Sequence, residues 1–132
     1  MTAHVRTTGP ARAGILIYAA DIEALARFYE HVVTMRRAHA DGDRIVLASS
    51  DMQLVIQSIP AAVARDMPAI AQEPRDRAAV KPFFTVASLD AARADAAEAG
   101  GAVMPGRWSG PGFTVCNAHD PEGNIVQLRE FA

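Results

Sequence analysis

Few side chains in this sequence could carry out chemistry. Lys81 is the single lysine among thirteen basic residues, and Cys116 is the single cysteine. One cysteine excludes an internal disulfide and any metal site built from several thiolates. Cys116 precedes His119 by three residues, and in a strand this spacing puts the two side chains on opposite faces, about 10 Å apart. We therefore interpret Cys116 as structural. Tyr18 is a candidate acid or hydrogen-bond donor, although a plain wall residue is the simpler interpretation.

Size and composition favour one compact unit with a sizeable core, since the chain has 132 residues of which 50% are hydrophobic. A net charge of −2 gives no electrostatic attraction to nucleic acid or to membrane surfaces. No apolar run approaches the ~20 residues of a membrane span, and residues 1–10 lack the pattern of a signal peptide. Together with the single cysteine, these features lead us to expect a cytoplasmic protein.

The first half of the sequence has the pattern of a strand, a helix and three strands. The apolar run at 14–18 predicts a strand, and Asp21 is a predicted N-cap. Apolar residues then recur at helical spacing, at Ile22, Leu25, Phe28, Tyr29 and Val32. Three more strands are predicted at 36–40, 44–48 and 52–59, separated by the turns 41–43 and 49–51.

The second half repeats this order. A strand is predicted at 82–86, Ser88 is a predicted N-cap, and Gly100 and Gly101 stop the helix. Three further strands are predicted at 103–108, 112–118 and 124–131. Asp21 and Ser88 are 67 residues apart, as are Gly14 and Lys81. We therefore predict an α+β fold of two tandem βαβββ modules, 13–59 and 81–132, with a flexible tail at 1–12 and a proline-containing linker at 60–80 that includes a short helical turn.

The last strands are predicted to form a hairpin. Residues 120–124, with the sequence Asp-Pro-Glu-Gly-Asn, form a turn because Pro121 fixes φ, Gly123 accommodates a positive φ, and Asp120 can bond its own backbone. Apolar residues alternate with others on both sides of this turn, at Phe113, Val115, Val126 and Leu128. This alternation predicts a hairpin with one buried face.

These modules and motifs resemble the vicinal-oxygen-chelate superfamily, which includes glyoxalase I, bleomycin-resistance proteins and extradiol dioxygenases. The resemblance covers most of residues 13–131. It rests on Asp21 with Phe28-Tyr29, on Phe84-Thr-Val86 before the alanine-rich helix, and most specifically on the turn 120–124. It implies a curved mixed sheet that forms a cup, with the helices on its convex face. It also implies a homodimer, with each cup formed within one chain or between two.

Metal-dependent members of this superfamily place one ligand on the first strand and one on the last strand of each module. The resemblance places these positions at Gly14, near Gln57, at Lys81 and at Gln127. Glycine has no side chain, glutamine is a weak neutral donor, and a protonated lysine repels a cation. We therefore expect no metal and no cofactor. Solvated or structural roles are expected for the histidines, which are His4, His31, His39 and His119.

Strand alternation predicts which residues share the cup face with these positions. That face would carry Leu16, Tyr18, Gln53, Val55, Phe83, Thr85, Ile125 and Arg129. The alternate positions are nearly all apolar, as a helix-covered face requires: Ile15, Ile17, Leu54, Ile56, Phe84, Val86, Val126 and Leu128. The candidate ligand-binding residues are Leu16, Tyr18, Gln57, Lys81, Phe83, Trp108, Gln127 and Arg129.

The leading functional interpretation is a metal-independent small-molecule-binding protein, as are the drug-sequestering resistance members of the superfamily. Lys81 and Arg129 would replace the charge of the metal and hold an anionic or carbonyl-bearing ligand, which Gln57 and Gln127 would orient. Alternatively, Lys81 reaches solvent and the glutamines have no role. A second class is an enzyme, namely a lyase or dioxygenase with displaced metal ligands or a metal-free catalyst using Lys81 and Tyr18. A third class, an interaction module without a ligand, would leave an apolar cup exposed to water.

Overall fold

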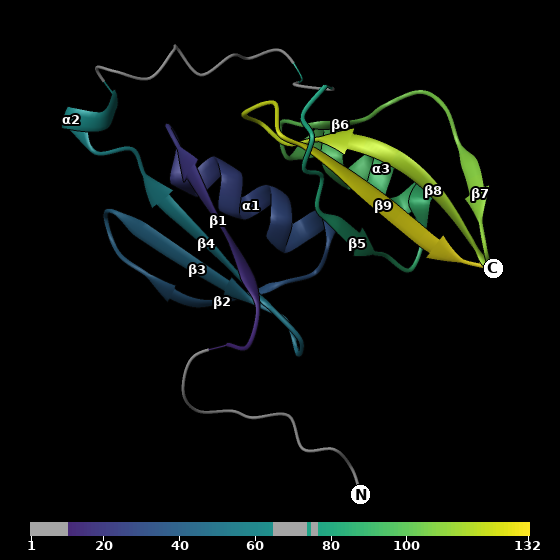
Figure 1. Ribbon diagram of the computed structural model, residues 1–132, viewed down its shortest axis with the longest axis horizontal. Helices are drawn as coiled ribbons and strands as arrows, with labels where there is room; N and C mark the ends of the chain where they lie inside the picture. The colour runs from purple at the N-terminus through teal and green to yellow at the C-terminus, as the bar shows by residue number, and fades with distance from the viewer. Residues whose placement is uncertain (1–10, 65–73, 75–76) are drawn as a thin grey trace, which may run out of the picture.

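The chain folds as two successive units of a strand, a helix and further strands (Figure 1). The computed structural model describes residues 11–64, 74 and 77–132. The first unit comprises β1 (Gly14–Ala19), α1 (Ile22–Val32), β2 (Arg36–Ala40), β3 (Arg44–Ala48) and β4 (Gln53–Ser58). A short helix, α2 (Ala61–Ala64), precedes the second unit, which comprises β5 (Phe83–Thr85), α3 (Leu89–Glu98), β6 (Ala102–Val103), β7 (Trp108–Gly110), β8 (Phe113–His119) and β9 (Ile125–Phe131). This order confirms the α+β class and the two βαβββ modules.

The predicted tail and much of the predicted linker lie outside the described residues, so the module boundaries stay predictions. In the described part of the chain, no helix combines the length and the apolar character needed to cross a membrane.

Each module has its own mixed sheet. The strand order in the first is β1-β4-β3-β2, with β1 parallel to β4 and the other pairs antiparallel. The order in the second is β5-β9-β8-β6, with β7 also paired to β8 and β5 parallel to β9. Among the described strands, no ladder joins the two sheets. The single strand predicted at 103–108 was wrong: Pro105 and Gly106 (φ 101°) interrupt it, and β6 and β7 form instead.

Helix α1 begins and ends where its sequence requires. The carboxylate of the N-cap Asp21 accepts a hydrogen bond from the backbone N–H of Ala24 at 3.0 Å. The helix ends just before Thr34, whose φ of 55° is left-handed. The predicted apolar stripe is buried at Leu25, Phe28, Tyr29 and Val32.

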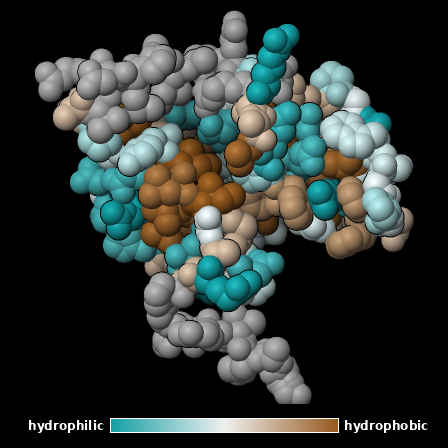
Figure 2. All heavy atoms as spheres, viewed as in Figure 1, coloured by the Kyte–Doolittle hydropathy of each residue, from teal (hydrophilic) through white to brown (hydrophobic). Residues whose placement is uncertain are grey.

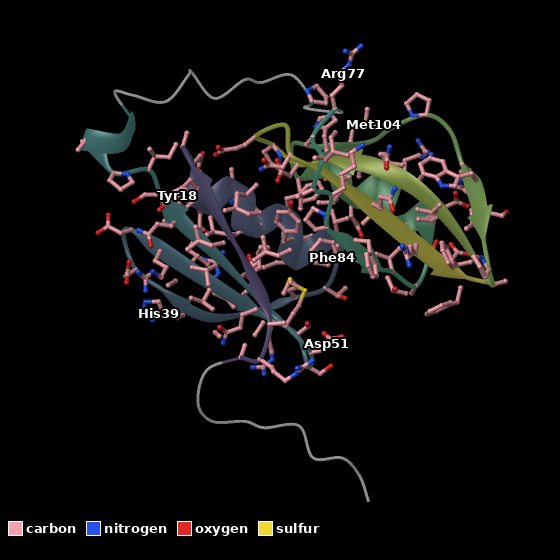
Figure 3. The ribbon with its side chains drawn as sticks, in the orientation of Figure 1. Tyr18, His39, Asp51, Arg77, Phe84 and Met104 are labelled. Atoms are coloured by element: carbon pink, nitrogen blue, oxygen red, sulfur yellow. The ribbon has the colours of Figure 1, made fainter. Side chains whose placement is uncertain are left out.

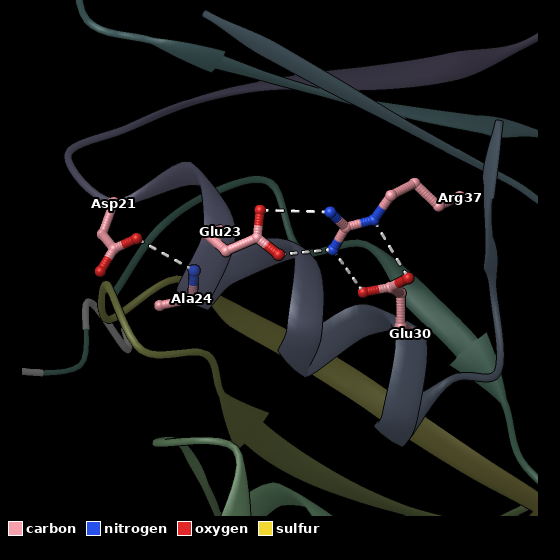
Figure 4. A network of polar contacts seen from close by, with 5 residues as sticks. All are labelled: Asp21, Glu23, Ala24, Glu30 and Arg37. Carbon is pink, nitrogen blue, oxygen red and sulfur yellow. Dashed lines mark hydrogen bonds and ion pairs between the residues drawn. The ribbon is translucent and has the colours of Figure 1, made fainter. Parts of the chain in front are cut away.

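Arg37 on β2 fastens α1 to the edge strand of the first sheet (Figure 4). Its guanidinium forms ion pairs with Glu23 at 2.9 Å and with Glu30 at 2.7 Å, which lie two turns apart on α1. The hydrogen bond from Arg37 lowers the pKa of Glu23, and the two carboxylates raise the pKa of Arg37. Arg37 thereby links β2 to two points of the helix that are two turns apart.

Helix α3 packs against α1 and joins the modules into one hydrophobic core. Ser88 caps it by accepting a hydrogen bond from the N–H of Ala91 at 3.1 Å. Gly101, just beyond this helix, makes room for α1, because a Cβ there would lie 2.6 Å from the ring of Phe28. Phe84 of β5 (Figure 3) also contacts α1, with its ring centre 5.8 Å from that of Tyr29.

The turn between β8 and β9 connects the second module to the start of α1. Asp120 is fully buried, and its carboxylate accepts hydrogen bonds from the Tyr29 hydroxyl at 2.7 Å and from the backbone N–H of Asn124 at 3.0 Å. The carboxylate of Glu122 accepts the backbone N–H groups of Ala20 at 2.9 Å and Asp21 at 2.8 Å. The predicted turn motif therefore also holds the two modules together.

β8 and β9 form the predicted hairpin, but the assignment of its faces was wrong. Val115 lies opposite Arg129, and Cys116 lies opposite Leu128. Phe113 and Val115 therefore share a face with Arg129, whereas Leu128 shares the other face with Cys116. The prediction failed because Val115 and Cys116 are both buried, at 2% and 0% exposure, so burial does not alternate between the two faces at this point of β8.

Candidate functional site

Among the described elements, each sheet is covered by a helix on one side only. α1 contacts β3 and β4, and α3 contacts β6 and β9. In Figure 1, β1 passes in front of α1, and β8 and β9 pass in front of α3. The viewer therefore looks onto the opposite side of each sheet, which we call its helix-free face.

The helix-free face of the first sheet is apolar at its centre. Leu16 and Tyr18 are 53% and 46% exposed there. Leu16 pairs with Val55, and Val55 pairs with Val46, so the three side chains form a row across β1, β4 and β3. Figure 2 shows an apolar patch over these strands with polar residues around it. The predicted alternation of faces is confirmed in this module, since Leu54 and Ile56 on the other side are fully buried.

Gln57 lies at the rim of this patch, and both ends of its side-chain amide form hydrogen bonds within the protein. Its Oε1 accepts a hydrogen bond from Arg44 Nε at 2.9 Å, and its Nε2 donates to the backbone oxygen of Asp43 at 3.1 Å. Arg44 pairs with Gln57 across the strands and adds a cation to this face. Sequence reasoning missed Arg44, although alternation within 44–48 places it on the same side as Val46.

The helix-free face of the second sheet brings together four of the predicted residues. The strand registers place these side chains on it: Phe83, Thr85, Trp108, Phe113, Val115, Asn117, Gln127 and Arg129. Phe83 and Trp108 are 54% and 46% exposed, so aromatic surface is accessible here. Ile125 was also predicted to line this face, and it shares the register, but it is only 3% exposed.

Arg129 lies between aromatic rings from the two strands that flank β9. Its guanidinium carbon is 3.8 Å from the centre of the Phe83 ring and 4.5 Å from the centre of the Phe113 ring. Cation–π contacts of this kind stabilise by about 0.5–2 kcal/mol each, depending on solvent exposure. We call these three residues the Arg129 stack. Sequence reasoning identified Arg129 and Phe83 but missed Phe113, because it had placed Phe113 on the buried face.

Two polar atoms on this face are buried without a hydrogen-bond partner among the described residues: Arg129 Nε and Asn117 Oδ1. An unsatisfied buried polar group typically costs about 1–3 kcal/mol. Asn117 lies opposite Gln127, the cross-strand neighbour of Phe83, so both atoms belong to the surroundings of the stack. The face thus has hydrogen-bonding capacity that its own residues leave unused.

Lys81 lies two residues before β5 and is partly buried. The side chains of Lys81 and Tyr18 have no hydrogen-bond partner among the described residues. The role of Lys81, as a ligand contact or as a solvated residue at the start of the strand, stays a prediction.

The donor set does not fit the metal centre that the resemblance implies. Gly14 pairs with Gln53, so Gln57 lies four residues further along β4, about 13 Å away at the usual strand rise. Gln57 is also held by Arg44, and Lys81 is a cation. In the described part of the chain, no group of three or more His, Cys, Asp or Glu side chains could hold a metal ion.

The Cys116 thiol is not arranged as a nucleophile. It is fully buried on the helix side of the second sheet, opposite Leu128, and burial raises its pKa. His119 has the opposite strand parity, and its Nδ1 lies 3.0 Å from the backbone oxygen of Asp120. The interpretation of Cys116 as structural agrees with this placement.

Solved structures share this fold at low sequence identity. A glyoxalase/bleomycin resistance protein/dioxygenase family enzyme from Burkholderia phytofirmans PsJN matches with a TM-score of 0.71 and 15% identity, covering 93% of this chain and all of that one. A glyoxalase/bleomycin resistance protein from Albidiferax ferrireducens T118 matches with a TM-score of 0.66 and 17% identity, covering 91% and 98% of the two chains. The fosfomycin resistance protein FosX from Mesorhizobium loti matches with a TM-score of 0.63 and 12% identity, covering 96% and 95%.

A search of curated proteins found no match to this chain. The sequence itself matches the family model described as a glyoxalase-like domain over residues 14–129, which includes nearly all of both modules and every predicted site residue. The agreement of fold and sequence identifies this chain as a member of the glyoxalase-like domain family.

Proposed function

We propose that this protein binds a small organic ligand, anionic or carbonyl-bearing, on the helix-free faces of its sheets and without a metal. The observation that carries the proposal is the combination of accessible aromatic surface with cations that lack an acidic partner. Phe83 and Trp108 supply the aromatic surface, and Arg129 forms no ion pair among the described residues. Small-molecule sites combine apolar walls with a few convergent polar groups in this way.

We prefer the binding hypothesis to catalysis because the candidate catalytic residues form no nucleophile–base pair with any described residue. Cys116 is buried, and neither Lys81 nor Tyr18 has a hydrogen-bonded side chain nearby among the described residues that could act as its base. Lyase or dioxygenase activity stays an alternative prediction.

The proposal is tested by a thermal-shift screen of small organic anions, cations and neutral carbonyl compounds against protein treated with a chelator. We expect anions and carbonyl compounds to raise the melting temperature, because ligand that binds only the folded state stabilises it. Stabilisation by cations alone, or by no compound of any class, would contradict the proposal.

Lys81 is tested separately through its replacement. If it contributes charge to the ligand, Lys81→Met lowers the affinity for the best anion of the screen by about tenfold, or ~1.4 kcal/mol. Unchanged affinity would remove Lys81 from the site and leave it as a solvated residue.

We also propose that a second copy of the chain covers part of these faces. Leu16, Phe83 and Phe131 are 53%, 54% and 68% exposed, so both sheets carry large apolar side chains that a partner chain would cover. A homodimer would bury this surface by symmetry.

A further inference from the structure

We infer that the Arg129 stack is a carboxylate-binding site, and that the ligand is an organic carboxylate with a flat apolar body. This inference rests on the proposed function and narrows it from anions and carbonyl compounds to one chemical class and one anchoring residue. It assigns the anchoring charge to Arg129 rather than to Lys81.

The hydrogen-bonding capacity of Arg129 is unused. A guanidinium carries five N–H donors in its plane, and none has a partner among the described residues, including the buried Nε. The rings of Phe83 and Phe113 lie against the guanidinium, and their π-electrons accept no strong hydrogen bond. Nε itself is buried, so what the stack offers to a ligand is the terminal N–H groups of the guanidinium, held in place by the two rings.

The backbone of β7 fixes the outer ring of the stack. Gly110 pairs with Phe113, and a Cβ at position 110 would lie only 2.3 Å from Cζ of that ring. Only glycine leaves the Phe113 ring room to lie over the strand and reach Arg129. The orientation of the guanidinium is thus fixed by residues of four strands, β5, β7, β8 and β9, as recognition of a planar anion requires.

No carboxylate of the described hairpin faces Arg129. Glu130, next to it on β9, points to the helix side and accepts the N–H of Leu89 at 2.6 Å. In the turn, the Asp120 carboxylate accepts a hydrogen bond from the Tyr29 hydroxyl, and the Glu122 carboxylate accepts one from the backbone N–H of Ala20, before α1. The acids of the hairpin are all hydrogen-bonded elsewhere, and Arg129 forms no ion pair among the described residues.

The chemistry of the surrounding face defines the rest of the ligand. A carboxylate matches the fork of a guanidinium with two parallel hydrogen bonds, which a single carbonyl oxygen or an ammonium group cannot form. Phe83 and Trp108 provide accessible ring surface on the same face, against which a flat apolar body can pack. An aromatic or similarly flat monocarboxylate meets both requirements.

The test uses benzoate as the probe and benzamide, its neutral analogue of the same shape, as the matched compound. Binding to the full-length protein is measured by titration calorimetry and by amide chemical-shift changes in β8 and β9. We expect benzoate to bind at least about tenfold more tightly than benzamide. Equal binding of the two, or no binding of benzoate, would overturn the inference.

Three variants locate the charge. Arg129→Met should weaken benzoate binding at least about tenfold, and Arg129→Lys should also weaken it because lysine keeps the charge but loses the planar fork. Arg27→Met removes the same charge from the exposed side of α1 and should bind benzoate as the unmodified protein does. Amide spectra confirm that each variant is folded. Unchanged binding by folded Arg129→Met would overturn the inference.

Phe83→Leu gives a second test that does not depend on replacing Arg129. Phe83 is more than half exposed, so the variant should fold, yet it removes one ring of the stack and should also weaken benzoate binding. If compounds of the wider screen bind but are insensitive to Arg129 and Phe83, only this inference fails. If no compound binds at all, the proposed function fails with it.

Discussion

The hydroxyl of Tyr29 links the two modules through one buried hydrogen bond. It is fully buried between the two modules and donates a hydrogen bond of 2.7 Å to the buried carboxylate of Asp120. A buried carboxylate needs such partners, because leaving it unsatisfied costs the full desolvation of a charge. The contact therefore contributes to stability across the module boundary.

Tyr29→Phe should lower the free energy of unfolding by about 1.5–3 kcal/mol, the usual value of a hydrogen bond to a charged group. Urea denaturation followed by circular dichroism measures this. The matched control is Tyr18→Phe, which removes the same atom from a half-exposed side chain and should change stability by less than ~0.5 kcal/mol. Equal effects of the two replacements would contradict the role assigned to Tyr29.

Tyr29 should also make the protein sensitive to alkali. Burial, followed by the charge of Asp120, raises the pKa of Tyr29 in the folded state well above its ordinary value. Above pH ~10 the unfolded chain releases this proton and the folded chain keeps it, so stability falls by up to about 1.4 kcal/mol per pH unit. Below that pH the stability contributed by the protonated Tyr29 hydroxyl is fully present. In Tyr29→Phe, stability should fall less steeply as the pH rises. The raised pKa of Cys116 accounts for part of the fall that remains.

At the scale of residues, the sequence predicted which side chains of a single strand are buried, because these alternate along the strand. It missed the contacts between side chains of different strands, because these depend on the strand register. The buried Leu54, Ile56 and Leu128 were identified correctly, because a strand with one covered face alternates with period two. The Arg129 stack could not be predicted, since it requires knowing which residues of β5 and β8 lie beside Arg129. For the same reason, the engagement of Gln57 by Arg44 follows only from the pairing of β3 with β4.

At the scale of elements, the turn between β8 and β9 is the connection on which the arrangement of the modules depends. Its residue Glu122 is 6% exposed and accepts two backbone N–H groups at the start of α1, more than a hundred residues earlier in the chain. Negative charge at the N-terminal end of a helix is favourable, and charge-assisted hydrogen bonds are stronger than neutral ones. The turn and the helix therefore stabilise each other.

Glu122→Gln should lower the free energy of unfolding by about 1–3 kcal/mol, because it removes the charge and one of the two accepting oxygens. Thermal and urea unfolding measure the change. Glu98→Gln is the control, since Glu98 is an exposed residue near the end of α3 and should tolerate the same replacement within ~0.5 kcal/mol. A loss no greater than that of the control would show that the connection has no energetic role.

Most helices and strands were predictable because capping and turn residues mark where they begin and end. Asp21 caps α1 and Ser88 caps α3, as the position of each before a run of helical spacing indicates. The division of β6 from β7 was missed although Pro105-Gly106 carries the signal of a break, and the tertiary role of Glu122 has no local signal at all.

At the scale of the whole molecule, the exposed large apolar side chains are concentrated on the helix-free faces: among the described residues, all of them except Val80 lie there. Figure 2 shows this concentration over the first sheet. The two sheets share a core through α1 and α3 but are not joined by a strand ladder among the described residues. Such an arrangement leaves the faces available to a ligand and to a second copy.

Light scattering coupled to size-exclusion chromatography should show two chains per particle. Replacement of Phe131 by Asp, on the exposed end of β9, should shift the particle toward a single chain if this surface is part of the interface. Particles of one chain at all concentrations of the unmodified protein would rule out the dimer.

The central claim, binding without a metal, is tested most directly by measuring the metal content of the purified protein together with its melting temperature in added divalent metals. The account predicts no stoichiometric metal and no stabilisation by nickel, zinc, manganese or iron, because Gly14, Gln57, Lys81 and Gln127 form no suitable donor set. A bound metal in a one-to-one ratio, or a large stabilisation by any of these ions, would contradict the account and make a metal-dependent enzyme the better interpretation.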